Sequence, residues 1–110
     1  MVVSRTEKKF KKLSKEGCSG LVTFLTAGDP NLELSAHILD MLPSAGADVI
    51  ELGIPFSDPM ADGPIIQASS QRALANGVNV SDVLSMVSSF RKTDQETPVI
   101  LMGYYNAVFI

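Results

Sequence analysis

Three short apolar segments separated by helical patterns constrain this chain more than any other feature. They lie at residues 20–26, 48–52 and 99–103, and all are rich in aliphatic side chains. The first is apolar at nearly every position, which is typical of a strand buried on both faces of a parallel sheet. Strands that alternate with helices pair in parallel through right-handed crossovers. The sequence therefore predicts one α/β unit.

The amino terminus is predicted to form a helix with one packing face. Val3, Thr6, Phe10 and Leu13 recur at helical spacing, and six of the nine basic residues lie in the same stretch. A basic helix of this kind also resembles an organellar transit peptide, an alternative that the acidic residues Glu7 and Glu16 weaken. A solvated surface helix is the favoured interpretation.

Three more helices are predicted, over residues 30–42, 64–75 and 81–90. Asp29 is placed to cap the first of them, with Pro30 at its first position. Apolar and small residues at helical spacing define the packing faces of the other two. These faces comprise Ile65, Ile66, Ser69 and Ala73 in one helix and Val83, Leu84, Val87 and Phe90 in the other.

Composition excludes several classes of protein. The 110 residues, 45% hydrophobic and 19% charged, fit one folded domain. No apolar run approaches the ~18 residues of a membrane span, and the amino terminus lacks a signal-peptide core. Cys18 is the only cysteine, so a reducing, cytoplasmic location is expected, and the net charge of −3 argues against nucleic acid as a partner. Because the chain stops in an apolar stretch just after the third strand, we expect it to be truncated.

The segment at residues 51–64 is the candidate site. Burial of a carboxyl such as Glu51 beside aliphatic side chains is costly unless it is neutral or paired, and ligands bind beyond the carboxyl ends of strands in α/β folds. There Glu51 could act as a general acid or base, while Asp62 in a wetter loop would stay ionised and stabilise positive charge. The alternatives stay open on spacing alone: Glu51 could face outward and pair with a lysine, and Asp58 and Asp62 could simply shape turns.

Other chemistry finds little support in the sequence. His37 and Cys18 have no neighbouring ligand or base in the sequence, so neither a metal site nor a nucleophilic triad is predicted. No glycine-rich loop of the P-loop or dinucleotide type is present. Phe24 and Tyr104 are of a type more often found in cores than in ligand sites.

Residues 51–67, ELGIPFSDPMADGPIIQ, resemble the signature of the tryptophan synthase α chain family. Residues 24–30, 45–48 and 101–106 are similar to that family's other strand and loop segments. The resemblance implies a TIM (β/α)8 barrel, of which residues 1–110 would be the amino-terminal part: a helix and the first three β/α units, truncated after strand 3. A whole barrel needs about 250 residues, and its phosphate site usually follows strands 7 and 8.

The resemblance also implies an activity, the retro-aldol cleavage of indole-3-glycerol phosphate to indole and glyceraldehyde 3-phosphate. By similarity, Glu51 is the general acid and base, and Asp62 accepts the indole N–H. Phe24, Met102 and Tyr104 would line the indole pocket. Without the phosphate-binding loops, we expect the 110 residues alone to be inactive.

A partner is implied as well. The loop at Pro55, Asp58 and Pro59 would meet the tryptophan synthase β chain in an α2β2 assembly. The β chain carries pyridoxal phosphate, whereas the α chain needs no cofactor. Two alternatives remain: a non-catalytic module that binds the β chain, and a different barrel enzyme acting on a phosphorylated substrate, which the paired carboxylates disfavour.

Overall fold

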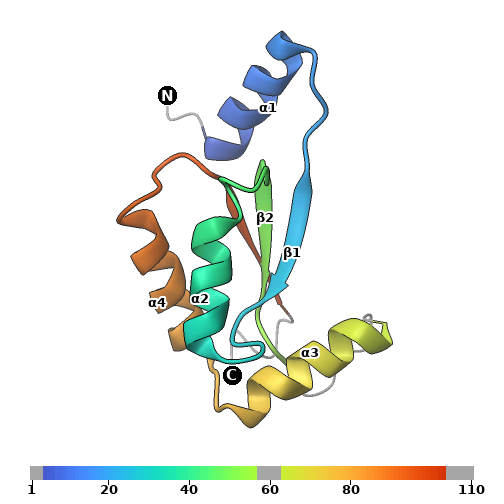
Figure 1. The fold of residues 1–110 in the computed structure, drawn as a ribbon, viewed down its shortest axis with the longest axis vertical. Coiled ribbons are helices and arrows are strands. Elements are labelled where there is room, and N and C mark those ends of the chain that lie inside the picture. The colour runs from blue at the N-terminus through green and yellow to red at the C-terminus, as the bar shows by residue number, and fades with distance from the viewer. Residues whose placement is uncertain (1–3, 57–62, 104–110) are drawn as a thin grey trace.

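The computed structural model describes residues 4–56 and 63–103, which form a three-stranded parallel sheet and four helices (Figure 1). The strands are β1 (Val22–Thr26), β2 (Val49–Gly53) and β3 (Val99–Met102), in the order β1-β2-β3. Glu51 of β2 is in register with Phe24 of β1 and with Ile100 of β3. The parallel sheet predicted from the alternation of strands and helices is confirmed.

The helices occupy three different places around the sheet (Figure 1). Helices α2 (Leu32–Met41) and α4 (Val80–Arg91) contact each other along one face, where α2 also contacts β1. Helix α3 (Pro64–Ala75) crosses the carboxyl end of the sheet and contacts β1. Helix α1 (Arg5–Glu16) lies near the amino ends of the strands. The bounds predicted for α3 are confirmed to the residue.

The hydrophobic core lies between the sheet and the helices α2 and α4. Ile50 and Leu52 project from β2 into it and are fully buried, as are Leu39 of α2 and Val83 of α4. Phe90 of α4 is the largest fully buried side chain. Complete burial of such side chains contributes about 1.5–3 kcal/mol each, so this layer holds the described part of the fold together.

The opposite face of the sheet is open, which corrects the expectation that β1 is buried on both faces. Alternate residues of a strand project to opposite faces, so Phe24 and Val22 project away from the core. Together with Ile100 and Met102 of β3 they are 38–48% exposed. The exposure is limited to the middle of this face, because Val49 and Thr26 also project to it and are only 1% and 5% exposed.

The prediction that Asp29 caps the second helix is wrong. Asn31 is the N-cap of α2, and its side chain accepts a hydrogen bond from the backbone N–H of Leu34 at 2.9 Å. The carboxylate of Asp29 instead binds Arg72 of α3. A carboxylate this close to a guanidinium gains a charge-assisted bidentate contact, which is stronger than a neutral cap.

The predicted packing faces are confirmed only in part. Ser69, Ala73, Val83 and Phe90 are buried, whereas Phe10, Ile65 and Leu84 are exposed. Ile65 is 81% exposed, because it stands in the first turn of α3, away from the contact of this helix with β1. Helical spacing finds the buried face but does not say how far along the helix the contact extends.

Candidate functional site

The open face of the sheet brings together three of the predicted site residues. Phe24, Glu51 and Met102 project from β1, β2 and β3 to this face, which is the one that α2 and α4 leave uncovered. Glu51 is the only ionisable side chain on this face of the three strands and is half-buried. It stands in the middle of β2, two residues before the strand ends at Gly53.

The ring of Phe24 leans toward the carboxyl end of the sheet and lies over Gly53. A Cβ atom at Gly53 would come within 2.6 Å of Phe24 Cζ, closer than packed atoms approach. The glycine therefore makes room for the ring beside Glu51. This arrangement places a flat apolar surface next to the strand position of a carboxyl group.

Four predicted site residues cannot be placed. Asp58, Pro59, Asp62 and Tyr104 lie outside the described residues. Pro55, predicted to contact a partner, is in the loop directly after β2 and is buried.

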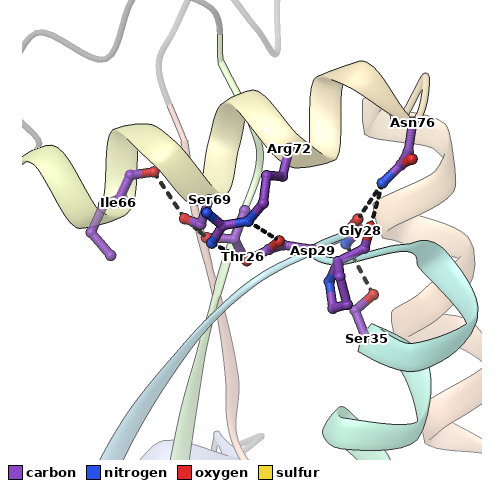
Figure 2. Close-up of polar contacts among 9 residues, drawn as sticks. Thr26, Gly28, Asp29, Ser35, Ile66, Ser69, Arg72 and Asn76 are labelled. Atoms are coloured by element: carbon purple, nitrogen blue, oxygen red, sulfur yellow. Dashed lines mark hydrogen bonds and ion pairs between the residues drawn. The ribbon is translucent and has the colours of Figure 1, made fainter.

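An ion pair joins the loop after β1 to α3 at this end of the sheet (Figure 2). Arg72 Nε donates to Asp29 Oδ1 at 2.7 Å, and Arg72 Nη2 donates to Asp29 Oδ2 at 3.0 Å. The hydrogen bond to Asp29 raises the pKa of Arg72 above its ordinary value, so this side chain keeps its charge at every pH of interest. The contact has the two-point geometry that guanidinium and carboxylate groups favour.

Two further polar contacts connect the same elements (Figure 2). The hydroxyls of Thr26 and Ser69 are 2.7 Å apart and buried. Because the hydroxyl of Ser69 donates to the carbonyl of Ile66, it is Thr26 that donates to Ser69. Asn76 Nδ2, at the end of α3, donates to the carbonyls of Gly28 and Pro30.

Sequence reasoning missed these α3 side chains as partners of the β1 loop. Ser69, Arg72 and Asn76 recur at positions i, i+3 and i+7, so they share one side of the helix. This helical spacing of polar residues, beside the apolar residues of α3, could have indicated that the helix contacts another element through that side. Nothing local in the sequence indicates that the partners lie more than 40 positions away.

Within residues 4–56 and 63–103, no three His, Cys, Asp or Glu side chains lie close enough together to hold a metal ion. His37 and Cys18 are both exposed. None of the helices in these two ranges is long and apolar enough to cross a membrane.

Comparisons of the sequence and of the structure with known proteins all match tryptophan synthase α chains. The family described as "Tryptophan synthase alpha chain" matches residues 10–110. A tryptophan synthase α chain of Cupriavidus pinatubonensis is 54% identical over 106 residues, which cover 96% of this chain and 40% of that relative. The chain thus spans about two fifths of the length of such relatives.

Solved structures of tryptophan synthase match the fold of this chain. The tryptophan synthase subunit α of Legionella pneumophila superimposes with a TM-score of 0.95 at 52% identity, over 97% of this chain and 41% of that one. A structure of the tryptophan synthase α2β2 complex of Pyrococcus furiosus matches with a TM-score of 0.76 at 46% identity, over 82% of this chain and 36% of that one. The fold described above is therefore the same as the corresponding part of these proteins.

Proposed function

The chain belongs to the tryptophan synthase α chain family, and from this premise we propose that it is the amino-terminal part of a (β/α)8 barrel lyase. The reaction is the cleavage of indole-3-glycerol phosphate to indole and glyceraldehyde 3-phosphate. The observation that carries the proposal is the position of Glu51. It is the one ionisable group on the open face of the strands, beside the ring of Phe24.

Glu51 acts as the general acid and base. It protonates the indole ring carbon that bears the glycerol phosphate, which gives a positively charged indolenine. Glu51, now a carboxylate, takes the proton from the hydroxyl on the adjacent side-chain carbon, and this side-chain carbon becomes the aldehyde carbon. The carbon–carbon bond breaks, its electron pair returns to the ring, and indole leaves. A positioned acid and base of this kind contributes about 10²–10⁴-fold in rate.

Asp62 stabilises the charge that this protonation creates. As a carboxylate it accepts a hydrogen bond from the indole N–H and favours the indolenine electrostatically. Phe24, Met102 and Tyr104 line the indole pocket. The exposure of Phe24 and Met102 supports such a role, because both side chains are free to contact a ligand or the remainder of a barrel.

The activity is tested in a joined barrel, in which residues 1–110 are followed by the part of the Legionella pneumophila chain that continues beyond its matched region. We expect the joined barrel to release indole and the 110 residues alone to release none. Glu51→Gln should lower kcat by about 10³-fold, while Glu33→Gln, an exposed acid of α2, should leave it unchanged. A folded joined barrel that releases no indole would refute the proposal.

Asp62→Asn separates the two carboxyl roles. The amide keeps an acceptor for the indole N–H but loses the negative charge, so kcat should fall while substrate still binds. An unchanged kcat would exclude an electrostatic role for Asp62.

The partner is a tryptophan synthase β chain, which supplies pyridoxal phosphate and consumes the indole in the cytosol. A relative crystallised as an α2β2 complex supports this assignment. Since Pro55 is buried, the contact would run through the later part of its loop, including Asp58 and Pro59. Titration of a β chain with the joined barrel, and with an Asp58→Ala variant, measures the interaction. Binding without indole release would favour the non-catalytic module instead.

A further inference from the structure

We propose that Arg72 and Asp29 are positioning residues, which hold α3 at a fixed angle across the carboxyl end of the sheet so that the reaction proceeds at its full rate. The inference deepens the proposed function and rests on it. It begins from the bidentate contact between these two side chains, at 2.7 and 3.0 Å.

The packing of α3 explains why a polar contact sets its orientation. Its buried side chains are only Ser69, Ser70 and Ala73, all of them small. The larger side chains of Ile66 and Leu74 are only half-buried, so few van der Waals contacts define the rotation and tilt of this helix. The hydrogen bonds of Ser69, Arg72 and Asn76 to the β1 end therefore define them.

The amino terminus of α3 begins without a capping side chain. Gly63 is its N-cap and provides no side-chain hydrogen bond. In the sequence Gly63 directly follows Asp62, the proposed charge-stabilising group. The position at which the chain enters α3 thus depends on how the rest of the helix is held.

Geometry sets the size of the effect. Arg72 is nine positions after Gly63, which is about 13 Å along the axis at ~1.5 Å per residue. A tilt of about 5° around Arg72 moves Gly63 by about 1 Å, and a misplacement of about 1 Å can cost about 100-fold in rate. The contacts of Thr26 and Asn76 remain when the ion pair is removed, so we expect a smaller loss, of about 10-fold.

The ion pair is poorly suited to a purely stabilising role. The side chain of Arg72 is 56% exposed, and exposed ion pairs contribute little to stability. The planar guanidinium of Arg72 nevertheless fixes the direction of both hydrogen bonds to Asp29, which the ammonium group of a lysine cannot do. Orientation is therefore the property that this contact supplies.

The experiment compares variants of the joined barrel. Arg72→Gln and Asp29→Asn should each lower kcat about 10-fold with KM within about twofold, and the double variant should be no worse than either single one. Arg72→Lys should recover part of the loss. Lys9→Gln removes a second ion pair of the described residues, at 3.9 Å to Asp48 near the amino end of β2, and should leave kcat unchanged. A wild-type kcat in Arg72→Gln would overturn the proposal.

Hydrogen exchange provides a readout that does not require activity. In Arg72→Gln the amides of residues 67–70 should exchange at least about 10-fold faster, whereas those of residues 84–90 in α4 should not change. If the parent joined barrel releases no indole, the proposed function fails, and this measurement still decides whether the ion pair holds α3. Unchanged exchange at residues 67–70 would overturn the positioning role whatever the activity.

Discussion

Substitution of Gly28 by alanine should destabilise the fold more than the same change at any other glycine with positive φ. Gly28 lies in the loop after β1 at φ +89, and a Cβ atom there would stand 2.3 Å from Val78 Cγ2 and 3.0 Å from Val78 Cβ. Val78 is 4% exposed and belongs to the core cluster. The backbone N–H of Gly28 also donates to the hydroxyl of Ser35 at 2.9 Å, which holds the loop in place.

The expected cost has two parts. A side chain at positive φ costs about 1–2 kcal/mol, and forced overpacking of a core costs about 1–3 kcal/mol more. Gly77 is the matched control, because its φ is +76 but nothing lies within 4 Å of its added Cβ. Gly77→Ala should therefore show only the first part, and Gly28→Ala both, a total of about 2–5 kcal/mol.

Urea denaturation of the joined barrel, followed by far-UV circular dichroism, measures the difference. Equal free energies of unfolding for Gly28→Ala and Gly77→Ala would refute the reasoning, because the contact with Val78 would then contribute nothing. Val78→Ala removes both γ carbons that the new Cβ approaches. The double variant should accordingly be more stable than the sum of the two single effects predicts.

Three other predictions concern the core, the acid transition and the site. Phe90→Ala removes the largest fully buried side chain and should cost about 3–5 kcal/mol in the free energy of unfolding. Burial alone would raise the pKa of Asp94, but hydrogen bonds from the hydroxyl and amide of Thr97 and the amide of Glu96 lower it overall. The carboxylate of Asp94 therefore stabilises the fold at pH values above its ordinary pKa, and this contribution is lost as the pH falls through the lowered pKa. At pH 7, Asp94→Ala should lower the free energy of unfolding by about 1 kcal/mol. In acid titrations this difference between the variant and the parent should shrink below about pH 4. Gly53→Ala would displace the exposed ring of Phe24 and should raise KM with little change in the melting temperature, and an unchanged KM would argue against a pocket at this ring.

The sequence was sufficient for features that depend on local patterns. The helix at Pro64–Ala75 and the parallel order of the strands follow from periodicity, capping residues and the alternation of strand with helix. Asp29 shows where this reasoning fails, because a residue of capping type binds whichever donor the fold brings nearest. Its donor is 43 positions away in α3, and Asn31 caps α2 instead.

The prediction that β1 is buried on both faces failed for a related reason. An apolar strand reads the same whether both of its faces are covered or only one, since the pattern records the preference of each side chain and not its neighbours. Here α2 and α4 cover the face of Ile50 and Leu52, and the face of Phe24 remains open among the described residues. The open face could be identified only once the register of β1 with β2 was known, because that register places Glu51 beside Phe24.

The two faces of the sheet impose opposite requirements on the same short strands. The covered face needs side chains that pack tightly, and residues such as Ile50 and Leu52 meet that need with aliphatic groups. The open face needs space and one acid, which Gly53 and Glu51 supply at alternating positions of β2. Because the fully buried side chains of α3 at the end of this face are all small, a change in its polar contacts can alter the site without unfolding the core. Stability and reactivity therefore depend on different side chains, and the variants of Phe90 in α4 and of Arg72 in α3 address them independently.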